Sequence, residues 1–172
     1  MQNVCILEYW KLIDFLIYMW YYSYMKIITE NREAKHNYFL DSFTEAGIVL
    51  VGSEVKSLRE GKCNLKDSYV VIRGGEVFLL NAFISQFEKS SHFAPDERRT
   101  RKLLLNVQEI FKFEKKVKTQ SMTIIPTKMY FNDKNKVKIE IALAKGKHNY
   151  DKKKDLMKSD LKRYAERQIK MN

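Results

Sequence analysis

The sequence predicts a mainly β protein with a few short helices and a basic C-terminal tail. Apolar and polar residues alternate, as in a strand with one buried face, most clearly over Lys136–Ala144. A Gly74-Gly75 pair separates two apolar runs, which is typical of a two-residue hairpin. We count about six short antiparallel strands, and periodicity alone leaves open whether they form a small closed barrel or a sandwich.

Composition points to a polyanionic partner. The chain has 172 residues, 45% of them hydrophobic, and a formal net charge of +11. The length fits one domain with appendages, and the charge favours nucleic acid. Cys5 and Cys63 form no C-x-x-C pair, so we expect a reducing compartment, no disulfide framework and no zinc site.

Residues 1–25 differ from the rest of the chain. They are apolar and aromatic, and their only charged residues are Glu8, Lys11 and Asp14. The longest uncharged run, Phe15–Met25, has 11 residues, whereas a membrane span needs about 20. A basic n-region and a small-residue cleavage site are also missing. We therefore expect no membrane partner, and interpret residues 1–25 as an extension outside the domain, with Met25 as the native initiator.

The first half of the domain is expected to open with a strand over residues 36–51, broken near Glu45. A short helix follows at about 53–60, with Ser53 as its N-cap and Gly61 as its left-handed end. One face of that helix is apolar, formed by Val51, Val55 and Leu58.

Two strands, Asp67–Arg73 and Glu76–Ile84, are expected on either side of the glycine pair. The polar and basic stretch Ser85–Arg101 contains Pro95 and is expected to be an exposed loop.

The second half is expected to contain three strands and one helix. Lys102–Leu105 is a short apolar strand, and the N-x-x-E pattern that begins at Asn106 predicts a capped helix. The helix should bury the stripe Ile110, Phe113 and Val117 and end near Thr119. Met122–Phe131 is a strand in which Pro126 predicts an edge or a bulge, and a turn over 132–135 leads into the alternating strand.

Catalytic and metal-binding patterns are missing from the sequence. The three histidines are far apart, and no G-x-S-x-G, P-loop or dinucleotide fingerprint occurs. The sequence therefore favours a protein that is not an enzyme and that needs neither a cofactor nor a metal.

Several long motifs resemble the SsrA-binding protein (SmpB) family of bacterial trans-translation. The resemblance covers about residues 31–170. The matching motifs are Asn31–Phe39, Phe43–Gly47, Gly52–Arg59, Gly61–Tyr69, Arg99–Leu105, Ala142–Lys147 and Asp151–Lys153. It implies an oligonucleotide-binding-like (OB-like) barrel of about six strands over 26–144, with two or three flanking helices, followed by a tail over 145–172.

The resemblance also implies a surface for the tRNA-like domain of transfer-messenger RNA (tmRNA). The matching positions are Asn31, His36, Tyr38, Glu45, Leu104, Asn106 and Lys138. His36 and Tyr38 lie two apart on an expected strand, so both rings should share a face and could stack on unpaired bases. Tyr38 could equally be an ordinary barrel residue.

The other positions also allow two interpretations. Glu45 can accept hydrogen bonds from base amino groups or ribose 2′-hydroxyls, and Lys138 can pair with a phosphate. Alternatively, Glu45 is a turn carboxylate, Leu104 a core residue and Lys138 a solvent-facing lysine. A basic cluster would neutralise phosphates or keep a loop soluble; its members are Arg98, Arg99, Arg101 and Lys102.

The tail carries ten basic and four acidic residues. Because it cannot bury enough apolar surface, we expect it to be disordered when free. The resemblance implies that it binds the ribosome, in the decoding centre and the mRNA channel, and becomes helical there. The matching residues are Lys145, Gly146, Lys147, Tyr150, Asp151, Lys152 and Lys153. Lys153 stands where the family carries arginine, so a bidentate contact is lost.

The resemblance thus implies a cytoplasmic, monomeric adaptor without catalytic activity. It would bind tmRNA and deliver it to stalled ribosomes for rescue and peptide tagging. Two alternatives remain at this stage: a generic OB-fold RNA-binding or ribosomal structural protein, and an RNA-modifying or RNA-cleaving enzyme.

Overall fold

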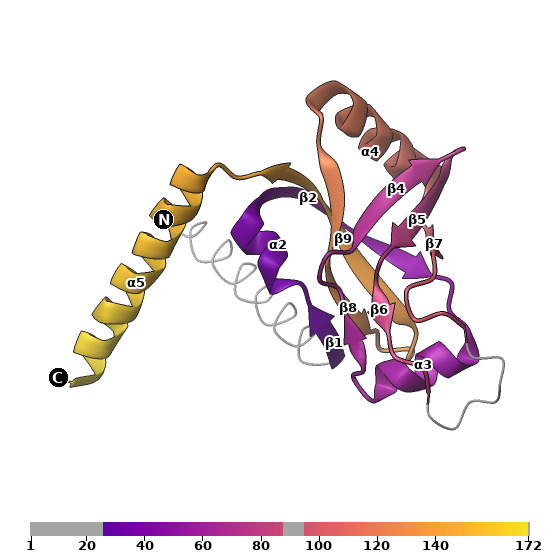
Figure 1. Ribbon diagram of the computed structural model, residues 1–172, viewed down its shortest axis with the longest axis horizontal. Helices are drawn as coiled ribbons and strands as arrows, with labels where there is room; N and C mark the ends of the chain where they lie inside the picture. The colour runs from indigo at the N-terminus through magenta and orange to yellow at the C-terminus, as the bar shows by residue number, and fades with distance from the viewer. Residues whose placement is uncertain (1–25, 88–94, 172) are drawn as a thin grey trace, which may run out of the picture.

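Six antiparallel strands form a closed ring in the computed structural model, which describes residues 26–87 and 95–171 (Figure 1). Around the ring these strands are β8 (Thr123–Phe131), β4 (Tyr69–Arg73), β5 (Glu76–Leu80), β7 (Arg101–Leu104), β2 (Tyr38–Ile48) and β9 (Val137–Gly146), and β9 pairs with β8 to close it. The predicted mainly β class and small closed antiparallel barrel are confirmed. The extension over residues 1–25 lies outside the described residues.

Three short strands were not predicted as separate elements. β1 (Lys26–Glu30) pairs with the C-terminal half of β8. β3 (Cys63–Asn64) pairs with β6 (Phe83–Ile84) in a separate two-stranded sheet. β6 is separate because Asn81, with φ of 58°, ends β5 early. The expected single strand to Ile84 is therefore two strands.

The glycine pair forms the predicted hairpin between β4 and β5. Arg73 pairs with Glu76, and φ is 58° at Gly74 and 75° at Gly75. Two consecutive positive φ values are typical of the type I′ turn, whose twist matches that of the flanking strands. The sequence therefore located this hairpin correctly.

A helix replaces the expected start of the first strand. Residues Arg32–Asn37 form α2, and β2 begins only at Tyr38. The Asn31 side chain starts the helix by accepting a hydrogen bond from the Ala34 backbone N–H at 3.1 Å. The prediction that His36 and Tyr38 share a strand face is therefore wrong, because His36 lies in the last turn of α2.

Strand β2 is continuous through Glu45, where a break was expected. Its irregularity lies earlier, because the register with β9 shifts between Asp41 and Thr44. Ser42 sits there with φ of 52°. This is a β-bulge, which bends a strand and re-aims its side chains.

The inside of the ring is filled by aliphatic side chains from every strand of the ring. The most deeply buried include Leu79, Met129, Ile139, Ile141 and Leu143. The alternation predicted for the last strand is confirmed in β9 as far as Ile141, but Ala142 and Ala144 are buried as well, and the strand continues to Gly146.

Helix α3 (Gly52–Arg59) closes one end of the ring, where Leu58 is buried in the core. Its N-cap is Val51 and not the predicted Ser53, because Ser53 already lies inside the helix. The Glu54 carboxylate reaches back and accepts from the Val51 N–H at 2.8 Å. Gly61 follows the helix with φ of 74°, as predicted.

The predicted basic cluster is divided by burial. Arg101 is fully buried, and its guanidinium donates to Glu54 Oε1 at 2.9 Å and to the Ala82 carbonyl at 2.6 Å. Arg99 also binds Glu54, at 2.6 Å. These two arginines tie the loop before β7 to α3. Because Arg101 is fully buried, the interpretation of Arg101 as a phosphate-neutralising or solubilising surface residue is wrong.

Helix α4 (Val107–Gln120) has the predicted capped start, with the Glu109 carboxylate accepting from the Asn106 N–H at 2.9 Å. Phe113 is buried, with Ile110 and Val117 packed against the same core. In β8 the register shifts between Pro126 and Lys128, which confirms the predicted bulge.

Helix α5 (Asn149–Met171) extends away from the ring (Figure 1). Its exposed apolar side chains Met157, Leu161 and Tyr164 are 67%, 70% and 64% accessible. The structure therefore describes the tail in the helical form that was expected on the ribosome; its disorder in the free chain stays a prediction.

Candidate nucleic-acid interface

Four of the predicted RNA-binding residues gather on the outer surface of three neighbouring strands and the start of α4. Gly47 on β2 pairs with Leu104 on β7 on one side and with Lys138 on β9 on the other. Glu45 lies two residues before Gly47 and therefore on the same side of β2. We call the set Glu45, Leu104, Asn106 and Lys138 the Glu45 face.

Glu45 is held by one partner on the adjacent strand β9 and one on β8, the strand beyond it. Lys138 Nζ lies 2.9 Å from Glu45 Oε1, and the buried Tyr130 hydroxyl donates to Glu45 Oε2. Desolvation by burial favours the neutral acid. The hydrogen bonds from Tyr130 and Lys138, with the charges of Lys138 and Lys128, outweigh it and lower the pKa of Glu45. The carboxylate is thus a fixed, ionised acceptor on the surface.

This network continues along the same surface towards β1. Glu140 is the cross-strand partner of Glu45. Its carboxylate pairs with Lys128 Nζ at 3.0 Å and accepts from Thr127 Oγ1 at 2.6 Å. The Lys128 ammonium also lies 5.8 Å from the centre of the Tyr130 ring. Glu45 and Glu140 thus face each other across β2 and β9, and each carboxylate is paired with a lysine, Lys138 or Lys128.

Leu104 and Asn106 form the edge of the Glu45 face towards α4. The Leu104 side chain is 55% accessible, which excludes the alternative that it is a core residue. A Cβ added at Gly47 would lie 3.2 Å from Leu104 Cβ. Any other residue at position 47 would therefore crowd Leu104, which would have to move by a few tenths of an ångström. Asn106 is exposed immediately before the first turn of α4.

The other three predicted residues lie at the far end of β2, around α2. Asn31 is buried, and its amide nitrogen donates to the Leu65 and Pro126 carbonyls at 3.1 and 3.2 Å. These bonds hold α2 against two distant segments. His36 is exposed, and Tyr38 packs beside a small second core cluster of Ala34, Ile125 and Ala144.

The seven residues therefore do not form a single cluster. Tyr38 and Glu45 are seven residues apart on β2, a separation of about 20 Å along an extended strand. An RNA that touches both groups must cover the intervening surface, which is crossed by the bulge at Ser42.

The first two predicted tail residues belong to a strand of the ring. Lys145 and Gly146 are the last residues of β9, so the chain leaves the ring only after Gly146. The Lys147 N–H donates to the Asn37 carbonyl at 2.9 Å, and its ammonium donates to the Lys35 carbonyl at 2.9 Å. That ammonium also lies 5.1 Å from the centre of the Phe39 ring. The junction before α5 is thus anchored on α2 and β2.

The remaining tail residues lie in the first turns of α5. Tyr150, Asp151, Lys152 and Lys153 belong to this helix. Lys153 is exposed, whereas Asp151 and Lys152 are half-buried; the Tyr150 side chain lies outside the described residues.

Sequence reasoning missed several residues of the outer surface. Phe43 is 53% accessible, and Lys128, Tyr130 and Glu140 bind one another or Glu45. Phe43 could have been found, because it lies two residues before Glu45 on a strand. The partners on β8 and β9 could not, since strand register alone brings them to Glu45.

No group of three or more His, Cys, Asp or Glu side chains is arranged to hold a metal ion within residues 26–87 and 95–171. Over the same part of the chain, no helix combines the length and the apolar character needed to cross a membrane.

Comparisons with known proteins identify the family. The family model described as SmpB protein matches residues 28–171. The SsrA-binding protein of Symbiobacterium thermophilum is 49% identical over 143 residues, which cover 83% of this chain and 90% of the relative. The SsrA-binding protein of Clostridium tetani is 50% identical over 145 residues, covering 84% and 92%.

A solved structure described as "tmRNA-SmpB: a journey to the center of the bacterial ribosome" contains a similar chain. It superposes with a TM-score of 0.60 and 42% sequence identity, over 70% of this chain and 85% of the other. The family model covers most of the sequence, and the relatives match it over nearly their whole length. The chain therefore belongs to the SmpB protein family.

Proposed function

We propose that the protein is the tmRNA-binding adaptor of trans-translation. It holds the tRNA-like domain of tmRNA and delivers it to stalled ribosomes for rescue and peptide tagging. Family membership supports this proposal, and the observation that carries it is the Glu45 face. On this face an ionised carboxylate, a lysine and an exposed leucine meet beside Gly47.

The chemistry of this face suits a folded RNA. Glu45 offers an acceptor for base amino groups and 2′-hydroxyls, which phosphate-binding lysines cannot provide. Lys138 sits 2.9 Å away and offers a cation to a phosphate. Because the Tyr130 hydroxyl and Lys138 already fix the carboxylate, the face needs little reorganisation on binding.

The groups around α2 extend the contact. Exposed His36 offers a ring for stacking on an unpaired base. The Asn31 amide nitrogen already donates two hydrogen bonds within the protein. Its contribution is therefore to hold α2 in place, so that neighbouring side chains can contact the RNA. Tyr38 is half-buried and presents only part of its ring.

The tail supplies a separate, electrostatic contact with the ribosome. Ten basic and four acidic residues follow Ala144, and α5 points away from the ring. A cationic arm of this kind gains affinity by releasing counterions from RNA phosphates. We place the tail in the decoding centre and the empty mRNA channel, with the junction at Lys147 setting its direction.

The protein works in this scheme as a monomer in the cytoplasm and carries out no chemistry on the RNA. A tmRNA incubated with it keeps its length and its nucleotides, which mass spectrometry of the recovered RNA measures. Shortened or modified RNA would instead support an RNA-processing enzyme.

The test of the proposal is a competition gel shift with the labelled tRNA-like domain. We expect unlabelled tmRNA to compete far better than ordinary transfer RNA. Glu45→Ala and Lys138→Ala should each weaken binding about tenfold, because each removes a charged hydrogen-bonding group from the face. Equal competition by both RNAs would instead support a generic RNA-binding or ribosomal structural protein.

A second acid and base pair provides the matched control. Glu114 and Lys118 lie 2.7 Å apart on the exposed side of α4. Glu114→Ala and Lys118→Ala make the same chemical changes away from the Glu45 face, so they should leave the affinity within about twofold of wild type.

A further inference from the structure

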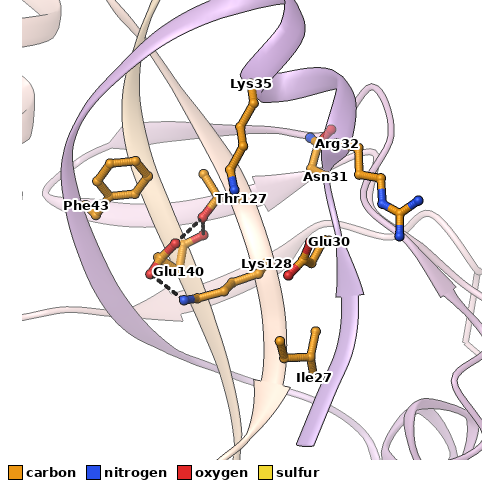
Figure 2. A pocket seen from close by; sticks show the side chains of 9 residues that line it. All are labelled: Ile27, Glu30, Asn31, Arg32, Lys35, Phe43, Thr127, Lys128 and Glu140. Carbon is orange, nitrogen blue, oxygen red and sulfur yellow. Dashed lines mark hydrogen bonds and ion pairs between the residues drawn. The ribbon is translucent and has the colours of Figure 1, made fainter. Parts of the chain in front are cut away.

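A pocket is lined by residues of β1, α2, β8, β9 and the bulge of β2 (Figure 2). It has a volume of about 570 Å³, within the range of roughly 300–1,000 Å³ that is typical of ligand sites. Asn31 and Lys35 line it at the α2 end, and Glu140, the cross-strand partner of Glu45, lines it at the other. The pocket therefore spans the gap between α2 and the Glu45 face.

The β2 bulge provides one wall of this pocket. The register shift between Asp41 and Thr44 leaves Phe43 without a cross-strand partner in β9. Ser42 has φ of 52°, and its hydroxyl accepts from the Lys116 ammonium at 2.7 Å. A bulge re-aims a side chain, and here the Phe43 ring is 53% accessible at the edge of the cavity (Figure 2).

The opposite walls carry charged groups. Lys35 extends from α2 into the cavity, and among the described residues its ammonium makes no ion pair (Figure 2). Lys128 and Thr127 on β8 are both bound to Glu140 and form an ordered floor. Glu30, the last residue of β1, adds an exposed carboxylate at the rim.

We propose that this pocket binds one unpaired nucleotide of an RNA partner, with its base against Phe43 and its phosphate at Lys35. An aromatic ring and a cation that line the same cavity can bind single-stranded RNA through stacking and phosphate pairing. The Glu30 carboxylate accepts hydrogen bonds, so it favours a base with an exocyclic amino group over uracil. The identity of the RNA rests on the proposed function. The nucleotide site itself is argued only from the residues that line the pocket.

Two RNA probes test the pocket in the full-length chain. The first is the tRNA-like domain of tmRNA, and the second is a 5′-phosphorylated oligoadenylate tetranucleotide, which forms no base pairs. Phe43→Ala should weaken both complexes about tenfold, whereas Phe43→Trp should retain them because a ring is restored. Lys35→Ala should weaken both and reduce the salt dependence of binding.

Phe111→Ala is the matched control. Phe111 lies on α4 and is 67% accessible, but it is outside the pocket. Its loss should change affinity for either probe by less than about twofold. Equal losses for Phe111→Ala and Phe43→Ala would overturn the proposal, since any exposed ring would then serve. Thermal unfolding of each variant checks the fold.

A third comparison addresses base preference. Oligoadenylate should bind more tightly than oligouridylate, and Glu30→Gln should narrow that difference because glutamine can also donate. If tmRNA binds but neither Phe43→Ala nor Lys35→Ala matters, the pocket is wrong and the proposed function stands. If tmRNA shows no advantage over transfer RNA while oligoadenylate still depends on Phe43, the pocket stands and the proposed function fails.

Discussion

At position 101 a charged side chain occupies the interior of the molecule. The Arg101 guanidinium is surrounded by acceptors: Glu54, the Ala82 carbonyl and the Glu97 carbonyl at 2.9 Å. Removing one partner of such a buried pair leaves the other charge without compensation, which costs more than the pair contributes when intact.

We therefore expect Arg101→Ala to lower the free energy of unfolding by about 3–5 kcal/mol, because Glu54 stays buried without this cation. Urea denaturation measures the change. Arg98→Ala is the control: Arg98 is exposed, and its loss should cost about 1 kcal/mol or less. Equal stability of both variants would show that the buried network does not hold α3 to the loop.

Two glutamates with lowered pKa values, Glu54 and Glu45, also predict the acid response of the protein. Desolvation opposes ionisation of Glu54, but bonds from Arg99, the Val51 N–H and Arg101 outweigh it and lower the pKa of Glu54. Glu45 has a lowered pKa for similar reasons. A lowered folded-state pKa stabilises the fold above the ordinary glutamate value of about 4.3, and this contribution is lost as the pH falls through the lowered pKa.

The melting temperature should accordingly fall as the pH drops below the ordinary glutamate value of about 4.3, because protons must be added to carboxylates that the fold holds ionised. Glu54→Gln should have a lower melting temperature at pH 7 and a flatter profile below about pH 4.5. A Glu54→Gln profile parallel to that of wild type would contradict the assignment of this loss to Glu54.

At the scale of elements, the sequence predicted the features that depend on local chemistry. Two adjacent glycines located the hairpin of β4 and β5, and the pattern from Asn106 to Glu109 located the start of α4. Both signals depend on residues within one turn. The mainly β class was also expected from the sequence patterns. The closed barrel and the residues of the Glu45 face were expected from the family resemblance.

Features that depend on tertiary partners were not predicted. Helix α2 is six residues long, and Asn31 stabilises it by binding the Leu65 and Pro126 carbonyls, which no local pattern indicates. Arg101 looked like a loop arginine because its partner, Glu54, is 47 residues away. The pairing of Glu45 with Tyr130 depends in the same way on strand register.

The junction of β2 and β7 yields a prediction at this scale. Gly47→Ala should displace Leu104, because the new Cβ would lie 3.2 Å from Leu104 Cβ. We expect a loss of about 1 kcal/mol in stability and a several-fold loss in tmRNA affinity, measured by denaturation and gel shift. Gly52→Ala is the control, since no atom lies within 4 Å of its added Cβ. Unchanged RNA affinity in Gly47→Ala would argue against Leu104 as a contact.

Helix α5 yields the second element-scale prediction. Its Met157, Leu161 and Tyr164 side chains are exposed, so little packing offsets the entropy cost of ordering its 23 residues. The free chain should therefore show little more helical circular dichroism than a chain lacking residues 149–172. A difference equal to a full 23-residue helix would contradict the expected disorder.

At the scale of the whole molecule, two parts divide the work. The closed ring presents fixed groups, such as the Glu45 carboxylate, to a folded RNA. The tail adds a dense positive charge beyond the junction at Lys147, which is anchored on α2 and β2. A rigid surface selects a shape, whereas a chain that orders on binding adapts to a channel lined by phosphates.

Deleting residues 149–172 tests this division most directly, with tmRNA affinity and peptide tagging on stalled ribosomes measured on the same protein. At about 0.15 M salt, where exposed charges are largely screened, the shortened chain should keep its affinity for the tRNA-like domain within about threefold. It should give no tagging, because the arm that enters the ribosome is gone. Loss of tmRNA binding, or tagging at the full-length rate, would contradict the division between ring and tail.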